Sequence, residues 1–152
     1  MAEQARETTT IAAPLGKVFD TLVDFEAYPQ WAADLKQARI VERDGEGRGL
    51  EVEYRAAAMG RSTTYRLRYD YDGSPNRLAW ALVAGDLERE LDGAYHLHPS
   101  PDDDSSTDII YELSIDLIVP IPGFVKRRAE HRIIKTALDQ LKQRVESLAG
   151  SG

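Results

Sequence analysis

Large aromatic residues recur at alternating positions of this sequence, and they favour a pocket for an apolar molecule. A dry core is built at lower cost from Leu, Ile and Phe, because each buried phenol needs a hydrogen-bond partner. Rings that share one face and carry hydroxyls suit an amphipathic ligand. In the alternative, the hydroxyls reach the rim and bond to water or backbone. The residues in the apolar phase are Tyr54, Tyr65, Tyr69, Trp80, Tyr95 and Tyr111.

Arg89 lies between Leu87 and Leu91, in the phase that should face the interior. A buried guanidinium without a partner is very costly, and a carboxylate, phenolate or quinone oxygen of a ligand would supply one. Two alternatives remain open. A bulge would turn Arg89 outward, or a carboxylate would form an internal ion pair with it; Glu88 and Glu90 alternate to the opposite side.

His131 shares a predicted helical face with Ile134, Leu138 and Leu141. Its ordinary pKa would let it act as a general acid or base, or donate to a ligand oxygen. In the alternative, a neighbouring tyrosine or a backbone group satisfies it. The predicted ligand-binding set is Tyr54, Tyr65, Tyr69, Trp80, Arg89, Tyr95, Tyr111, Phe124, His131 and Ile134, in which the candidates for catalysis are Arg89, His131, Tyr65 and Tyr95.

The composition argues against several other classes of site. A net charge of −7 disfavours nucleic acid, which needs a basic face. There is no cysteine, His96 and His98 fall on a polar phase, and the acidic run 102–104 lacks the spacing of a calcium loop, so we predict no metal and no cofactor. The polar N-terminus and the absence of a membrane-length apolar run predict a cytoplasmic protein.

The elements that position these residues follow from the periodicity of the apolar residues. Residues 122–148 repeat them at helical spacing, with Pro122-Gly123 before them and Gly150 after them. Pro14 opens a first helix and Asp24 is the predicted N-cap of a second, short one. The alternating segments lie within 7–12, 35–43, 50–56, 65–69, 78–82, 87–97 and 109–117, with turns at 59–60 and elsewhere and a flexible loop at 99–106.

This order predicts an α+β fold, in which a curved antiparallel sheet of seven strands wraps around the long C-terminal helix as β-α-α-β6-α. Curvature holds part of the sheet away from the helix and leaves room for a cavity. We expect a frayed N-terminus over 1–6, one domain over 7–148 and a disordered tail over 149–152.

Short motifs give the chain a family resemblance. They are Ala13-Pro14, Val18-Phe19, the run from Asp24 to Trp31, and Pro122-Gly123-Phe124-Val125. With them the chain resembles the START-like, helix-grip superfamily, and within it the polyketide cyclase/dehydrase and coenzyme Q-binding START-like proteins. The resemblance implies the helix-grip fold and a hydrophobic ligand, such as a lipid, sterol, quinone or polyketide, between sheet and helix. Some members catalyse cyclisation or dehydration, while many only bind or carry.

Three functions follow from this sequence. The first is binding or transfer of a small hydrophobic molecule, with no protein partner. The second is an aromatase/cyclase or dehydrase for a polyketide-type substrate, in which Arg89 would polarise a carbonyl and Tyr65, Tyr95 or His131 would move protons. The third is a regulatory or chaperone-like groove for a peptide, which only fold-level analogy supports.

An apolar segment at 119–125 precedes three consecutive cations at 126–128. It predicts transient contact with an anionic membrane through Ile121, Phe124, Lys126 and Arg127, and hence a peripheral location. In the alternative, the segment is a lid or staple that packs on the start of the helix, and the cations are merely solvated.

Overall fold

One antiparallel sheet of seven strands forms the body of the computed structural model, which describes residues 5–58, 61–118 and 122–150. The strands are β1 (Ala5–Ile11), β2 (Leu35–Arg43), β3 (Gly49–Ala58), β4 (Arg61–Asp70), β5 (Arg77–Gly85), β6 (Glu88–Ser100) and β7 (Asp103–Leu117). Their order across the sheet is β1-β7-β6-β5-β4-β3-β2. Six strands therefore follow one another as a meander, and β1 joins the edge at β7.

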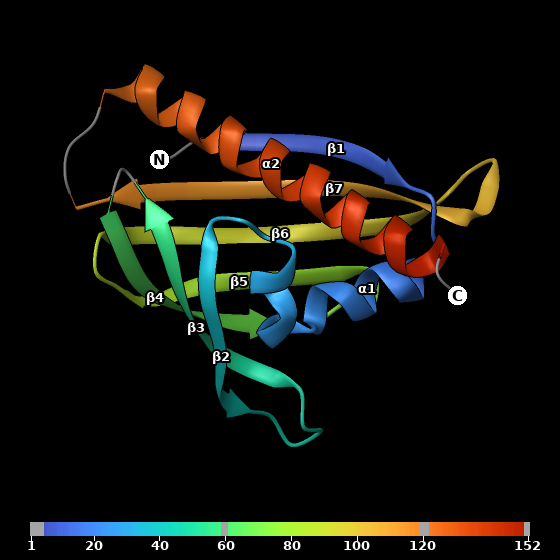
Figure 1. Ribbon diagram of the computed structural model, residues 1–152, viewed down its shortest axis with the longest axis horizontal. Helices are drawn as coiled ribbons and strands as arrows, with labels where there is room; N and C mark the ends of the chain where they lie inside the picture. Colours follow the sequence, from blue (N-terminus) through green and yellow to red (C-terminus); the bar gives the residue numbers. More distant parts are fainter. Residues whose placement is uncertain (1–4, 59–60, 119–121, 151–152) are drawn as a thin grey trace.

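The helices are α1 (Leu15–Val23), the 3-10 helix η1 (Phe25–Gln30) and α2 (Gly123–Gly150). Pro14 precedes α1 in an extended conformation, which suits a residue without an N–H at a helix start. The side chain of Asp24, predicted to cap the second helix, makes no capping hydrogen bond. The predicted order β-α-α-β6-α and the α+β helix-grip class are confirmed. Figure 1 shows α2 lying along β1 and β7, with α1 near its C-terminal turns.

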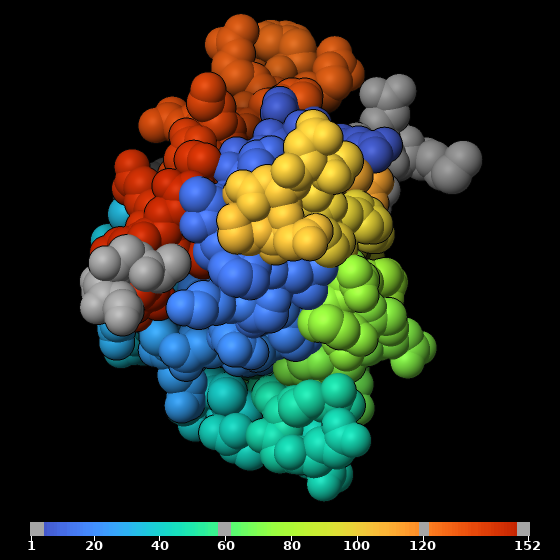
Figure 2. All heavy atoms as spheres, turned by 90° about the vertical axis from the view of Figure 1, so that its right-hand side faces the viewer, coloured from blue at the N-terminus to red at the C-terminus, as the bar shows by residue number. Residues whose placement is uncertain are grey.

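The C-terminal half of α2 is fixed by both its faces. Ile134, Leu138, Leu141 and Val145 are buried in the core. Polar side chains of α2 then bond to neighbouring backbone: Lys142 Nζ donates to the carbonyl oxygen of Thr10 at 2.6 Å, and Glu146 accepts the N–H of Ala12 at 2.9 Å. The same end of the molecule is filled by α1, the end of β1 and the β6–β7 hairpin (Figure 2).

Three boundaries differ from the sequence prediction. Ala5 and Arg6, expected to fray, pair with Leu113 and Glu112 of β7. The predicted loop at 99–106 is mostly strand, because β6 runs to Ser100 and β7 begins at Asp103. Polar side chains bond there across the strands, as where Ser100 donates to Asp108 at 2.8 Å. α2 includes positions 149–150 of the expected tail. Residues 1–4, 151–152 and the turn predicted at 59–60 lie outside the described residues.

Gly93 of β6 leaves room for the ring of Trp80 to approach its backbone closely. A Cβ at this position would sit 2.6 Å from Cζ2 of Trp80 and 2.7 Å from the carbonyl oxygen of Glu112. Gly93 pairs with Trp80 across β5 and β6, so the indole covers the space where a side chain would be. The position of Trp80 over the concave face therefore requires a glycine on the next strand.

We expect Gly93→Ala to destabilise the protein by about 1–3 kcal/mol, because Trp80 must shift against a packed core. Urea unfolding followed by circular dichroism measures the change. Gly16→Ala is the matched control, since a Cβ there meets nothing within 4 Å and α1 gains helix propensity. Equal stability of both variants would show that Trp80 does not depend on Gly93.

Candidate functional site

A cavity of about 470 Å³ lies between the concave face of the sheet and α2. It is much larger than the apolar cavities of about 150 Å³ that admit benzene, and it falls within the range of about 300–1000 Å³ usual for small-molecule pockets. Its exposed lining residues are Asp34, Ala57, Val125, Ala129, Arg132 and Ile133. The cavity therefore opens between the N-terminal half of α2 and the segments around residues 34 and 57.

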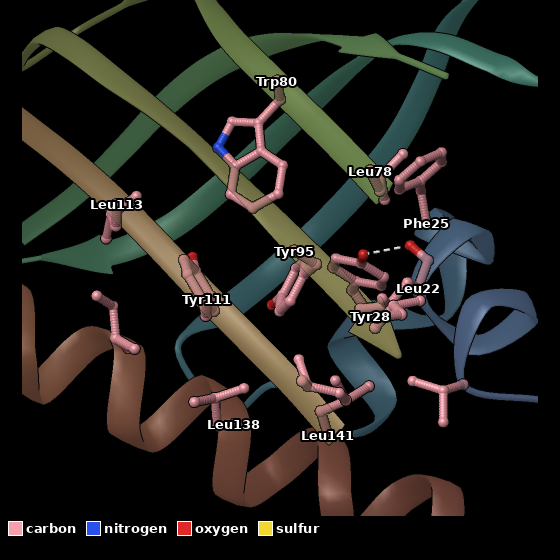
Figure 3. Close-up of a cluster of buried hydrophobic side chains, with 14 of the residues drawn as sticks. Leu22, Phe25, Tyr28, Leu78, Trp80, Tyr95, Tyr111, Leu113, Leu138 and Leu141 are labelled. Carbon is pink, nitrogen blue, oxygen red and sulfur yellow. Dashed lines mark hydrogen bonds between the residues drawn. The ribbon is translucent and has the colours of Figure 1, made fainter. Parts of the chain in front are cut away.

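Its sheet wall is a continuous row of aromatic rings. Strand register places them as cross-strand neighbours: Tyr54 pairs with Tyr65, and Tyr95 with Tyr111. The centroids of Trp80 and Tyr95 are 5.4 Å apart, and those of Tyr95 and Tyr111 are 4.4 Å apart. Figure 3 shows these three rings projecting from the sheet toward α2. The predicted inward phase of the six aromatic residues is confirmed, because all six line the cavity.

The polar atoms of these rings fall into two groups. In the first they bond to one another or to backbone: the hydroxyls of Tyr54 and Tyr69 are 2.6 Å apart, those of Tyr95 and Tyr111 bond to each other, and Tyr28 donates to the carbonyl oxygen of Leu22 (Figure 3). In the second, the hydroxyl of Tyr65 and Nε1 of Trp80 make no hydrogen bond within the described residues. No buried side-chain nitrogen or oxygen of those residues lacks a partner, so both atoms reach the open cavity. They are free to bond to a ligand.

Burial controls the ionisation of the phenols. It raises the pKa of every tyrosine in the wall, and the neighbouring phenols raise it further in Tyr54 and Tyr95. The pKa of Tyr65 is raised by burial, then by the charges of Tyr111, Glu88 and Asp34. These hydroxyls are therefore neutral near pH 7. They can donate or accept a hydrogen bond, but they cannot act as bases in the free protein.

For Arg89 the inward position is wrong, and the alternative of a bulge that turns it outward is confirmed. Glu88 pairs with Leu117 and Glu90 with Asp116, so β6 carries an extra residue in a bulge at Arg89. The bulge reverses the side-chain phase: Arg89 is exposed and Glu88 lines the cavity. Thr63, which is buried, donates to the Glu88 carboxylate at 3.0 Å. The charged residue of β6 that lines the cavity is therefore the carboxylate of Glu88 and not the guanidinium of Arg89.

The predicted inward position of His131 is also wrong. Its ring is half exposed, and Nδ1 lies 3.3 Å from a carboxylate oxygen of Glu7. The preceding residue, Glu130, is 2% exposed and lines the cavity, and it accepts the N–H of Ile115 at 3.0 Å. In the described residues, β1 begins at Ala5, which pairs with Leu113. The N–H of Ile115 therefore lies beyond the end of β1, and the Glu130 carboxylate accepts its hydrogen bond in place of a strand. Sequence reasoning misses Glu130 because it assigns a charged residue to the solvated face.

At two further positions of α2, the residue that lines the cavity is the neighbour of the one predicted from the sequence. Phe124 is 62% exposed and does not line the cavity, whereas Val125 does. Ile134 is fully buried in the core, and its neighbour Ile133 lines the cavity instead. Their predicted contact with a ligand in this cavity is therefore wrong, because the cavity face of α2 is rotated from the buried stripe by about 100°, the step of one helical residue.

Charge at the site comes from few residues. Lys126 and Arg132 of α2 and Asp34 lie at the mouth, while Glu88 and Glu130 lie further along the wall.

The described residues contain no cluster of three potential metal ligands. His96, expected at the surface, is partly buried with Nε2 2.7 Å from a carboxylate oxygen of Glu112. None of the described helices is both long and apolar enough to cross a membrane.

Comparison with known proteins places this architecture. Residues 2–146 match the profile of the family described as "Polyketide cyclase / dehydrase and lipid transport". The search of curated proteins found no match. A START superfamily protein from Mycobacterium smegmatis is similar in structure, with a TM-score of 0.90, 24% identity, and 95% of this chain and 98% of that chain covered.

Two further solved structures are similar. One is a Thermus thermophilus protein with a TM-score of 0.79 and 22% identity, covering 99% of this chain and 100% of that chain. The other is the Zhui aromatase/cyclase from Streptomyces sp. R1128, with a TM-score of 0.78 and 17% identity, covering 96% and 94%. At these identities the likeness is one of fold. The resemblance to the START-like superfamily is confirmed.

The shifted phenols predict how the protein responds to alkali. Each of the seven tyrosines has a raised pKa in the folded protein, that of half-buried Tyr71 being about 12. The unfolded chain loses these protons above about pH 10, while the folded chain keeps them. The tyrosines therefore leave the free energy of unfolding unchanged below about pH 10 and lower it as the pH rises above that value. We expect little tyrosinate absorbance in the folded protein at about pH 11, and a large increase when urea unfolds it. Ionisation near pH 10 without unfolding would contradict the burial of the phenols.

Proposed function

The chain belongs to the polyketide cyclase/dehydrase and lipid transport family, and we propose that it binds and carries a small hydrophobic molecule between the sheet and α2. The observation that carries the proposal is the aromatic wall around a cavity of about 470 Å³. A core that served packing alone would not contain such a cavity, because protein interiors are packed as densely as organic crystals and leave few voids larger than a water molecule. Transfer of apolar surface from water supplies the affinity, at about 25 cal/mol per Å² buried.

The free polar atoms narrow the ligand class. Nε1 of Trp80 donates, and the neutral hydroxyl of Tyr65 can donate or accept. A carbonyl oxygen on an otherwise apolar, planar molecule satisfies both, while the rings around it stack on that plane. The carboxylates of Glu88 on the sheet wall and Glu130 on the helix wall disfavour an acidic group at depth. Quinones and aromatic polyketides fit this description better than fatty acids.

Ligand uptake can be followed without a label, since both tryptophans of the chain, Trp31 and Trp80, line the cavity. We expect 2-methyl-1,4-naphthoquinone to quench their fluorescence with saturation. Ala137→Phe, which puts a ring into the cavity from α2, should weaken binding by about tenfold or more, equivalent to about 1.4 kcal/mol. Tyr65→Phe should weaken binding by about 2–10-fold, as expected for one lost hydrogen bond.

Two controls separate these effects. Arg89→Leu and His131→Ala change residues outside the cavity and should bind the quinone as the wild type does. Naphthalene, which has no carbonyl, should compete equally well for wild type and Tyr65→Phe. Unsaturable quenching, or full affinity in Ala137→Phe, would overturn the proposal.

A second candidate, cyclisation of a polyketide-type substrate, is favoured by one observation. Glu88 and Tyr65 both line the cavity, and Thr63, two residues before Tyr65 on β4, donates to the Glu88 carboxylate. A carboxylate beside a neutral phenol can remove a proton between two carbonyls while the phenol donates to the enolate oxygen. The enolate carbon then attacks a second carbonyl and forms the ring, and the protonated carboxyl group returns its proton to the new alkoxide. Arg89 and His131, which the sequence predicts for these roles, have no access to such a substrate.

This candidate predicts a separation of turnover from binding. Glu88→Gln keeps an oxygen that accepts from Thr63, so the fold and quinone affinity should persist, while cyclisation of a poly-β-ketone falls by about 100-fold or more. Product formation is measured by liquid chromatography. Wild-type protein that binds the poly-β-ketone without converting it is a carrier, and turnover unchanged in Glu88→Gln would exclude the carboxylate as the base.

A further inference from the structure

We propose that the N-terminal three turns of α2 dock on the surface of an anionic lipid bilayer and set the mouth of the cavity against it. The docking surface consists of Phe124, Val125, Lys126, Arg127, Arg128, Arg132 and Ile133. The inference rests on the proposed function, because it names the place where an apolar ligand would enter. It does not include Ile121, which lies outside the described residues.

The charge of this surface is opposite to that of the protein. The chain carries a net charge of −7, yet residues 123–135 contain five cations and a single carboxylate. That carboxylate belongs to Glu130, which is buried and accepts the N–H of Ile115. Within the described parts of the chain, none of the five cations forms an ion pair. Their field is therefore available to a negatively charged surface.

The same turns expose apolar side chains that the fold leaves uncovered. Phe124 is 62% exposed, and Val125 and Ile133 are 40% and 43% exposed. An aromatic ring and two branched side chains next to several cations are the composition of an interfacial helix, which buries its apolar side chains among lipid head groups. A protein partner of mixed charge would leave these cations unpaired, whereas an anionic bilayer matches all of them.

The docking surface coincides with the rim of the cavity. Val125, Lys126, Arg132 and Ile133 both line the cavity and belong to the docking surface. Beyond this point α2 is committed to the body of the protein, where Leu138, Leu141 and Val145 are buried. A bilayer against the first turns would therefore cover the mouth directly. An apolar molecule could then pass between lipid and cavity without crossing bulk water.

Co-sedimentation with vesicles tests the proposal. We expect the wild type to bind vesicles with about 30% phosphatidylglycerol in phosphatidylcholine, to bind pure phosphatidylcholine weakly, and to lose binding as salt rises. Arg127→Gln/Arg128→Gln should weaken binding roughly 30-fold, at about fivefold per cation. Phe124→Ser should also weaken it. None of these three residues lines the cavity, so quenching by the naphthoquinone should stay unchanged.

The controls make equal changes elsewhere. Lys17→Gln/Arg55→Gln removes the same charge from exposed positions, and Leu148→Ser removes an exposed apolar residue at the other end of α2. Both should bind vesicles as the wild type does. Absent binding, equal binding to neutral vesicles, or a wild-type dimer that Phe124→Ser dissociates would overturn the proposal. Vesicle binding without quinone uptake would instead reject the proposed ligand and retain the docking surface.

Discussion

The structure depends on one constraint: a single helix must cover a sheet that is wider than the helix. The C-terminal half of α2 is committed to the β1 edge by buried Leu141 and Val145 and by hydrogen bonds to Thr10 and Ala12. The opposite edge, formed by β2 to β4, is contacted at β2 by the short helix η1, while the described contacts of α2 with the sheet concentrate on β1 and β7. The right-handed twist of the sheet curls that edge around the gap instead of closing it. This arrangement leaves a cavity between the concave face of the sheet and α2.

The aromatic wall is the part of the site that sequence predicts best, and the reason is its period. Side chains of a strand alternate with a period of two, so one known inward residue fixes the others until the register shifts. Tyr65, Tyr69, Trp80, Tyr95 and Tyr111 all keep this phase. Arg89 lies at the point where a bulge inserts one residue, and phase counting inverts there. Nothing in the residues Leu87 to Leu91 announces the bulge, because it depends on how β6 meets the end of β7.

Helix α2 is harder to predict for a different reason. At about 100° per residue, Glu130 lies about 40° to one side of Ile134 and His131 about 60° to the other, which leaves both about 50° from the centre of the buried stripe. Periodicity alone does not separate the two residues, and hydropathy then assigns the histidine inward and the carboxylate outward. The deciding factor is the N–H of Ile115, which lies beyond the described end of β1 and is satisfied by Glu130. Such a demand arises only from tertiary contact, so no local pattern reveals it.

The two halves of α2 therefore differ: the C-terminal half is packed on the sheet, and the N-terminal half is largely exposed. Apolar contact and backbone hydrogen bonds at Lys142 and Glu146 fix the helix to the body of the protein. Around Phe124 and Val125 the helix leaves its apolar surface in solvent, at a cost that the fold itself does not recover. The buried contacts thus concentrate at the C-terminal end of α2, and the mouth of the cavity lies beside its exposed N-terminal turns.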